Sequence, residues 1–511
     1  MAILDPVKLA GRFQKAVADR QTWEGTWDKI YDLAFPGRQG FFSETQGQQR
    51  ASNIFDSTLM DATNEFASRM AFGLTPNFSE WFRLEPGPRA INDLENDKKK
   101  LSEVRRQMDS VTRYVFNVIQ SSNFQSANHE LMLDLSVGYS VLEINENRDP
   151  ARVLAFSTLP QTQCYLGLGP DGKVDQTYRK FSATPTAIRV MYPDATLPRG
   201  LPEDKLATVV DAIYRDWDKL DDEVHHRAVC VQGDQSDLSA PAWQTTYTGQ
   251  GSNPRIVVRW MTTPLEAYGR GPAYLALPDA RTANLATQLV LENAEMAISG
   301  MWQADDDGVI NVNTIRLVPG TVFPRDPDSR GLEPLTSPAR FDISQLLLDQ
   351  LRSQIRRTMF AMDFGPDSAK TPRSATEITE RSSNQAGRIS SPFARLMNEY
   401  IEPLIDRVVY ILKERGLVQL PKRNGKDVQI ISRSPLARAQ RMEEVYNLQQ
   451  FYSVLAGIYN VAAPAFLKEQ ETAGYLASRL EIPEDLLTDE DEREAAMQQI
   501  VSAMQPPQGQ P

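Results

Sequence analysis

The sequence predicts an α+β protein that is mainly helical and divided into several domains. Apolar residues recur at helical spacing up to about residue 137, and short alternating segments bounded by turn residues follow as far as residue 261. Long helical stretches return after Pro278. The chain has 511 residues, and a domain usually holds about 100 to 200, so several folding units are expected.

The N-terminal region, from residue 7 to about 137, should consist of amphipathic helices. Asp56 and Ser57 have the side chains of N-terminal caps and predict the start of one helix. Another helix is expected after the lysine run at 98–100. Its apolar face would hold Met108, Val111, Val115, Val118 and Ile119.

The central region should form antiparallel strands. Asn-Arg-Asp-Pro at 147–150 and Gly-Pro-Asp-Gly at 169–172 are turn sequences, and the segments beside them are short and rich in β-forming residues. Strands are expected at 139–145, 152–158, 163–168, 174–181, 224–231, 243–248 and 255–261.

Two long amphipathic helices should follow, separated by a polar excursion rich in Pro and Gly. The first covers 279–299 and would be a rod about 30 Å long, because an α-helix rises about 1.5 Å per residue. The second covers 343–362, where Arg352 and Arg356 flank an apolar stripe and Arg357 points away from it. The stripe consists of Leu348, Leu351, Ile355, Met359 and Met362.

A loop and a long helical stretch should come next. Residues 363–374 are rich in helix breakers, and 375–415 have a helical pattern that Pro392 and Pro403 should kink. The C-terminal region is also helical in pattern. It ends in an acidic patch at 486–494 and a polar tail that cannot form a core.

Composition excludes several functions. Lys and Arg number 55 against 67 Asp and Glu, so the net charge of −12 argues against tight wrapping of nucleic acid and leaves only local basic strips. The 3 histidines and 2 cysteines are too few for a structural zinc site or a disulfide framework. The longest apolar runs are too short to span a membrane, and the N-terminus lacks the pattern of a secretion signal, so no membrane partner is expected.

Two glycine-rich segments look like nucleotide-binding loops. GLGPDGKV at 167–174 has Val174 where a phosphate-binding loop needs a Ser or Thr hydroxyl for magnesium. Because Gly-Pro-Asp-Gly suits a turn between strands, a hairpin is the preferred interpretation and nucleotide binding the alternative. YGRGPAY at 268–274 has Tyr274 in place of the third glycine of a dinucleotide loop, which favours a strand-to-helix corner.

The remaining candidates for chemistry do not form an active site. His129 lacks a second histidine four residues later, and His225 and His226 lie in a strand-like run. The acidic clusters at 305–307 and 489–492 are contiguous, so their side chains diverge, and a solvated or interacting surface is favoured over a two-metal nuclease site. We therefore expect no enzyme activity, no catalytic residues, no metal site and no cofactor.

An ordered set of motifs carries a family resemblance over about residues 12 to 460. The N-terminal motifs are WEGTWDKIYDLAFPGR, NIFDSTLMDATNEFASRMAFGLTP and WFRLEP. The later motifs are YGRGP (268–272), ALPDARTAN (276–284), VPGTVFP (318–324), SATEITER (374–381), RLMNEYIEPLIDRVVYILKERG (395–416) and SPLARAQ (434–440). In this order they resemble the head-to-tail connector, or portal, protein of short-tailed bacteriophages, the podoviruses.

The resemblance implies a portal fold of wing, stem, clip and crown that assembles into a dodecameric ring with a central channel at one capsid vertex. Carried onto this sequence, it places the wing at 1–278, with a helical N-terminal part followed by an antiparallel β part. The other assignments are stem helices at 279–300 and 343–362, the clip at 301–342, the channel loop at 363–374, a long kinked wing helix and a following strand at 375–432, the crown at 433–490, and an acidic, disordered tail at 491–511.

Such a ring would be the conduit for packaging and ejecting the genome, in the virion and, during assembly, in the host cytoplasm. The implied partners are further copies of the chain, the major capsid protein, scaffolding protein, the terminase large subunit, a tail adaptor, internal core or ejection proteins, and double-stranded DNA in the channel. Two alternatives remain: a non-portal helical scaffold or adaptor protein of the virion, and a DNA-processing packaging enzyme.

A small set of cations is expected to face DNA in the channel. A surface past which DNA slides should carry few cations, because six to ten phosphate contacts already bind DNA tightly. For the stem arginines, ion pairs between subunits or along the helix, with acids such as Asp349, are an alternative. The candidates are Lys370 and Arg373 in the loop and Arg352, Arg356 and Arg357 on the second stem helix.

Overall fold

The computed structural model divides the chain into two units. The first comprises Met1–Asp367 and Ser391–Ile431, and the second comprises Ser368–Ser390 and Ser432–Pro511. The loop expected at 363–374, with Lys370 and Arg373, lies outside the described residues. The structure describes residues 6–42, 54–87, 91–93, 98–147, 149, 152–198, 201–219, 223–232, 241–299, 302–304, 332–334, 341–361, 392–418, 428–459, 472 and 475–476.

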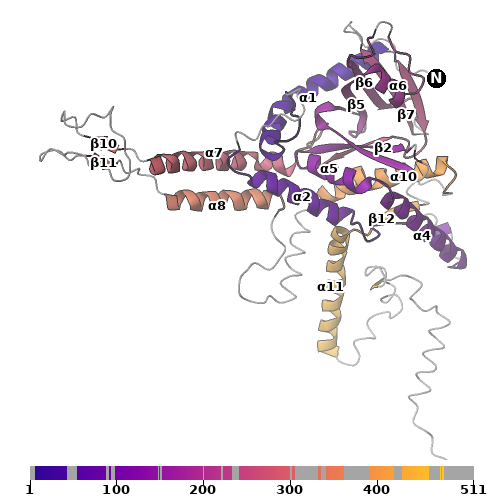
Figure 1. Ribbon diagram of the computed structural model, residues 1–511. Helices are drawn as coiled ribbons and strands as arrows, with labels where there is room; N and C mark the ends of the chain where they lie inside the picture. Colours follow the sequence, from indigo (N-terminus) through magenta and orange to yellow (C-terminus); the bar gives the residue numbers. More distant parts are fainter. Residues whose placement is uncertain are drawn as a thin grey trace, which may run out of the picture. The chain divides into compact units, whose positions relative to one another are not determined.

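The N-terminal part of the first unit is helical, as its periodicity predicts. Its long helices are α1 (Pro6–Ala34), α2 (Thr58–Leu74), α4 (Lys98–Gln120) and α5 (Phe124–Leu135) (Figure 1). The start of α2 is set by Asp56, whose carboxylate accepts a hydrogen bond from the backbone N–H of Thr58 at 2.9 Å. Ser57 occupies the cap position, but its side chain makes no capping hydrogen bond.

Two antiparallel sheets follow in the first unit. The larger has the strand order β4-β5-β6-β7-β8, and the smaller has the order β3-β2-β9. The strands expected from the sequence are confirmed within a few residues of their predicted ends. The strands of the two sheets are β2 (Tyr139–Glu146), β3 (Leu154–Leu159), β4 (Cys164–Leu168), β5 (Val174–Ala183), β6 (Ala207–Arg215), β7 (Val224–Gln232), β8 (Trp243–Thr248) and β9 (Arg255–Arg259), of which all but β6 were expected.

The sequence prediction missed two strands, β6 and β1 (Phe82–Pro86). β6 is the middle strand of the larger sheet, and its side chains are buried on both faces, so the polar–apolar alternation that marks a half-exposed strand is absent. β1 has only 5 residues and lies between helices, and it pairs with β12 (Val428–Ser432), the strand expected at the end of 375–432.

Helices cover both faces of the larger sheet. Leu9 and Phe13 of α1 pack on the face that presents Val210 of β6. The next residue back, Val209, points to the opposite face and packs with Ile188 of α6 (Pro185–Met191). This division follows from the strand geometry, in which successive side chains point to opposite faces.

The YGRGP motif forms the strand-to-helix corner that the sequence predicts. The backbone N–H of Gly271 donates to the carbonyl of Val137 at 3.0 Å, and that of Ala273 donates to Ser136 at 2.9 Å. A Cβ on Gly271 would collide with the carbonyl of Ser136, so glycine is required for this close approach. Tyr268 packs edge-on against Trp27 of α1 at 5.2 Å, which ties the corner to the core.

The corner leads into α7 (Pro272–Ser299), which lies side by side with α8 (Phe341–Thr358) in Figure 1. The predicted start of the first helix, after Pro278, is wrong: α7 begins at Pro272 and contains Pro278. The hydrogen bonds of Gly271 and Ala273 at the corner already fix the chain in place before Pro278. The helix therefore passes through a proline that removes one backbone donor.

The second helix of the pair ends earlier than the expected residue 362. Phe360 adopts a left-handed φ of 55°, and the N–H of Ala361 donates back to the carbonyl of Arg356 at 2.8 Å. This pattern closes the C-terminus of α8. Between the two helices, β10 (Trp302–Ala304) and β11 (Leu332–Pro334) pair as antiparallel strands.

The expected long helical stretch is described from residue 392 onwards. A π-helical turn at Met397–Ile401 leads directly into α10 (Glu402–Glu414), with Pro403 in the first turn of α10. Pro403 has no N–H to donate and crowds the carbonyl four residues before it, and a local widening of the helix relieves both problems. The irregularity predicted at Pro403 is therefore present as a π turn.

The second unit contains α11 (Pro435–Tyr459). This helix lies within 433–490, the segment that the resemblance assigns to the crown. It agrees with the helical pattern expected for the C-terminal region.

Candidate functional site

The helix pair α7 and α8 is fixed to the start of α2 by polar contacts. Nε of Arg352 in α8 lies 2.9 Å from Oδ2 of Asp56, whose side chain is buried. Asn284 of α7 accepts hydrogen bonds from the backbone N–H groups of Phe55 at 2.7 Å and Asp56 at 3.1 Å. Both helices of the pair therefore contact the same short segment of the first unit.

The charge of Asp56 is stabilised where it lies. Burial alone would raise its pKa, but hydrogen bonds from Thr58 and Arg352 outweigh burial and lower the pKa below its usual value. Asp56 is therefore ionised at neutral pH and pairs with the guanidinium of Arg352. This pair within one chain differs from the expected alternative of pairing between subunits or with an acid along the helix such as Asp349.

The other predicted cations divide between exposed positions and positions that the structure does not describe. Arg356 and Arg357 are exposed on α8, and no ion pair to either occurs among the described residues. Of the predicted stripe, Leu348, Ile355 and Met359 are buried. The helix thus presents a buried apolar face and a cationic outer side, as its sequence predicts.

The helix pair also exposes leucines. Such side chains on an otherwise polar helix favour burial against another surface. Among the described residues of α7 and α8, six leucines are about half exposed or more: Leu275, Leu285, Leu289, Leu291, Leu346 and Leu347.

A buried cluster of charges joins the two sheets. Arg227 of β7 contacts Glu143 of β2 at 2.9 Å and Asp211 of β6 at 2.6 Å, and Arg255 of β9 contacts Glu143 at 3.0 Å and also pairs with Asp211. Burial disfavours the charged carboxylates, but the two arginines lower the pKa of Glu143 to about 2 and hold that of Asp211 well below its usual value. Two acids and two bases thus neutralise each other between the sheets.

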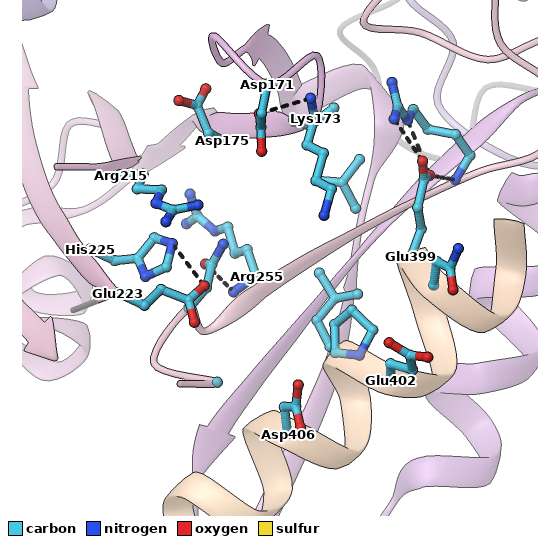
Figure 2. A pocket seen from close by; sticks show the side chains of 18 of the residues that line it. Asp171, Lys173, Asp175, Arg215, Glu223, His225, Arg255, Glu399, Glu402 and Asp406 are labelled. Carbon is cyan, nitrogen blue, oxygen red and sulfur yellow. Dashed lines mark hydrogen bonds and ion pairs between the residues drawn. The ribbon is translucent and has the colours of Figure 1, made fainter. Parts of the chain in front are cut away.

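A cavity of about 910 Å³ opens beside this cluster and is lined by charged groups of both signs (Figure 2). Figure 2 shows Arg215 and His225 from the larger sheet and Glu223, which comes just before β7, on one side, and Glu399 from the π turn on the other. Glu399 is already bound by Arg259, whose Nη2 lies 2.6 Å from Oε1. The lining is therefore rich in charge, but Glu399 and Arg259 in it are paired with each other and are not free to bind a ligand.

Ser252, His225 and Glu223 have the residue types of a hydrolase triad, and their geometry excludes that role. Nδ1 of His225 lies 2.9 Å from Oγ of Ser252, whereas Nε2 is 4.0 Å from Glu223. Ser252 is completely buried, so no substrate carbonyl can reach its hydroxyl. Burial lowers the pKa of His225 to about 4, which keeps its ring neutral at pH 7.

The segment that resembles a phosphate-binding loop is a hairpin turn. β4 and β5 pair on either side of it, and the N–H of Gly169 donates to the carbonyl of Lys173 at 2.8 Å. Gly172 has a φ of 75°, which the turn requires and glycine adopts readily. Because the N–H of Gly169 is used within the turn, the hairpin interpretation is confirmed.

The histidines and cysteines of the sheets are buried, and the histidine rings contact neighbouring polar side chains. His226 contacts Thr246 at 3.0 Å and Asp216 at 3.2 Å. Cys164 and Cys230 are free and buried, and burial raises the pKa of each thiol to about 11. In the parts of the chain that the structure describes, no three His, Cys, Asp or Glu side chains are grouped so that they could hold a metal ion.

Sequence reasoning missed the residues that fix the helix pair and join the sheets. The sequence marks Arg352 by its charge beside the apolar stripe. Its partner Asp56 is 296 positions away, and the sequence marks it only as a helix-cap residue. Asp211 lies in the missed strand β6, so no pattern marked it. Tyr192 also donates to Asp211 at 2.9 Å, which completes the surroundings of that carboxylate.

Comparison with known proteins gives a consistent match over nearly the whole chain. A family model described as "Bacteriophage head to tail connecting protein" matches residues 7–487. A "Probable portal protein" of Bordetella phage BPP-1 is 24% identical over 484 residues, which cover 89% of this chain and 83% of that protein. The "Portal protein" of Salmonella phage epsilon15 is 23% identical over 481 residues, which cover 88% of this chain and 82% of that protein.

A solved structure titled "Neck of empty GTA particle computed with C6 symmetry" is also similar. It shares 13% sequence identity with this chain. The alignment covers 84% of this chain and 92% of that chain, with a TM-score of 0.36.

Proposed function

The chain belongs to the family of bacteriophage head to tail connecting proteins, and on that premise we propose that it is a phage portal protein. The observation that carries the proposal is the match over residues 7–487 together with two relatives named as portal proteins, each covered over more than four fifths of its length. The protein would form a dodecameric ring at one capsid vertex, through which DNA is packaged and later ejected.

The helix pair α7 and α8 supports this proposal as the stem of the ring. Two helices side by side can line a channel when many copies stand next to one another. The exposed leucines Leu285 and Leu289 on α7 and Leu346 on α8 would then be covered by neighbouring copies. A ring closes by such head-to-tail contacts between unlike surfaces.

The segment between the two helices would be the clip. Its described strands are the short antiparallel pair β10, which comes shortly after α7, and β11, which comes shortly before α8. We assign the terminase large subunit during packaging and the tail adaptor afterwards to this segment. The wing would contact the major capsid protein, scaffolding protein and internal core or ejection proteins.

The charges of the chain suit a channel through which DNA must slide. The net charge of −12 disfavours tight binding of phosphates, and a few cations suffice for transient contact. We propose Lys370, Arg373, Arg356 and Arg357 for these contacts. Arg352 forms an ion pair with Asp56, and it would instead hold the stem to the wing.

The proposed role is structural and needs no catalysis or cofactor. The buried Ser252 cannot act as a nucleophile, and the hairpin at 169–173 does not leave the N–H of Gly169 for a phosphate. None of the helices in the described residues is long and apolar enough to cross a membrane. We place the protein in the virion at the portal vertex and, during assembly, in the host cytoplasm.

Labelling of particles tests the proposed location. An antibody fragment raised against the purified protein should mark one vertex of each particle that has lost its tail. A label spread over many vertices, or confined to the interior, would instead indicate a scaffold or internal protein.

A further inference from the structure

The helix α4 is basic in a chain that is acidic overall. Its sequence, KKKLSEVRRQMDSVTRYVFNVIQ, contains six Lys and Arg and two Asp and Glu, a net charge of +4. The whole chain has a net charge of −12. The first turn of α4 contains no acidic residue and begins with three lysines, although the N-terminal end of a helix favours negative charge.

The packing of α4 fixes which side faces outward. Met108, Thr112, Val115 and Ile119, spaced three and four residues apart, are buried. Arg83 of β1 binds Asp109 through Nε and Nη2, both at 2.6 Å, so one of the two acids of the helix is neutralised by the body of the protein. The hydroxyl of Thr112 accepts a hydrogen bond from the backbone of Leu84, which attaches the helix to the same strand.

The opposite side of α4 is a stripe of cations and small polar groups. Arg106, Ser110, Arg113 and Asn117 are all exposed, and their spacing of four, three and four residues places them on one helical face. No ion pair to Arg106 or Arg113 occurs among the described residues. The remaining acid, Glu103, lies on the flank and accepts a hydrogen bond from Gln107.

We propose that this face of α4, defined by Arg106, Ser110, Arg113 and Asn117, is a binding surface for the phosphate backbone of duplex DNA outside the channel. Arginine, serine and asparagine are among the side chains that bind phosphate oxygens in protein–DNA complexes. The stripe is about 16 Å long at 1.5 Å per residue, and duplex DNA carries a charge every ~1.7 Å of its axis, so several phosphates fall within reach.

The composition of the stripe favours DNA over a protein partner. The centre of a protein interface is normally apolar or aromatic and poor in charge, whereas all four residues of this face are polar or cationic. In Figure 1, α4 lies on the far side of the body from α7 and α8. If those helices form the channel, DNA bound to α4 is a different stretch of duplex from DNA in the channel.

A closed circular DNA tests the proposal without using the channel. Rings assembled in the absence of DNA are mixed with relaxed, covalently closed circular duplex DNA, which cannot thread a closed ring. The variant Arg106→Ala/Arg113→Ala should bind the circle about tenfold more weakly, and the slope of log affinity against log salt should fall by about 1 for each arginine removed per bound copy.

Two control variants show whether the position and the charge of these arginines matter. Lys173→Ala/Lys180→Ala removes two exposed cations from another surface and should bind the circle as the wild type does. Arg106→Lys/Arg113→Lys keeps the charge and should retain most of the affinity. Equal binding by the Ala variant and the wild type would overturn the proposal, as would equal loss in the Lys and Ala variants.

The remaining outcomes are also distinct. If the Ala variant binds the circle normally but no longer enters capsid shells, the face binds an acidic protein surface and the proposal is wrong. If the protein forms no ring, the proposed portal function fails, whereas the difference in circle binding between the Ala variant and the wild type still tests α4.

Discussion

Arg352 of α8 and Asp56, which lies two residues before the first residue of α2, form an ion pair across 296 positions of sequence, with Nε 2.9 Å from Oδ2. The carboxylate is buried and also accepts a hydrogen bond from the N–H of Thr58, the first residue of α2. The same side chain therefore contacts both the start of α2 and α8. The position of the helix pair on the first unit therefore depends on a contact that charge patterning alone does not reveal.

Removing this guanidinium should destabilise the attachment of α8. Arg352→Ala leaves the buried carboxylate of Asp56 without its ion-pair partner, and we expect a loss of about 1–2 kcal/mol in the free energy of unfolding. Arg357→Ala removes the same charge from an exposed position of the same helix and should change the free energy of unfolding by less than about 0.5 kcal/mol. Equal effects of the two substitutions in urea denaturation would show that the ion pair does not hold the helix.

Stability should fall as the pH rises through the titration of Asp134. Burial beside Glu130 raises the pKa of Asp134 to about 6, although Arg38 contacts it at 2.5 Å and opposes the shift. The folded state keeps this proton at a pH where the unfolded state has lost it, so stability decreases between about pH 4 and pH 6, by about 2–3 kcal/mol.

The substitution Asp134→Asn provides the control for this pH dependence. It removes the titrating group but keeps an oxygen that can accept the hydrogen bond from Arg38. The decrease in thermal midpoint between pH 4 and pH 6 should be absent or much reduced in the variant. The same decrease in both proteins would assign it to other carboxyl groups.

Charging the exposed leucines of the helix pair should prevent assembly while leaving the subunit folded. Leu285→Glu and Leu346→Glu each place a carboxylate on a surface that we propose to be covered by the next copy. Light scattering should show smaller species with an unchanged circular dichroism spectrum. Leu265→Glu, at a side chain that is 93% exposed on the loop before α7, should assemble normally; assembly by all three variants would exclude α7 and α8 from the interface.

The loop at 363–374 should contact DNA weakly. Lys370→Ala/Arg373→Ala is expected to leave ring assembly intact and to lower the retention of full-length DNA in filled heads, because fewer cations resist its backward movement. Lys173→Ala/Lys180→Ala removes the same charge elsewhere and should retain DNA normally. Wild-type retention by the loop variant at both high and low salt would leave Lys370 and Arg373 without an electrostatic role.

The protein should hydrolyse neither ATP nor DNA. The acids most able to bind catalytic metal ions by sequence are Asp305, Asp306 and Asp307, which lie outside the described residues. Magnesium-dependent turnover that survives purification and disappears when these three are changed to Asn would identify an enzyme.

The helices and most strands could be predicted because their patterns are local. The apolar spacing in α8 predicts that helix, and the turn residues at 169–172 predict the hairpin. The strand β6 could not be predicted in this way, because burial on both faces removes its alternation and with it any sign of Asp211. The end of α8 depends on the backbone at Phe360, which apolar periodicity does not report.

The candidate site was predictable only in part. Arg356 and Arg357 are exposed on the helix where the sequence places them, whereas the partner of Arg352 comes from another element. Contacts between residues far apart in sequence depend on how the elements pack. The basic face of α4 was also missed, because the apolar spacing along this helix predicts its buried side and does not report what its exposed side binds.

Assembly of the purified protein tests the central proposal most directly. Native mass measurement combined with negative-stain imaging should show a closed ring with a central opening and a mass near twelve times that of one chain. A monomer, a dimer or an open filament at micromolar concentration, with the chain correctly folded, would contradict the assignment as a portal.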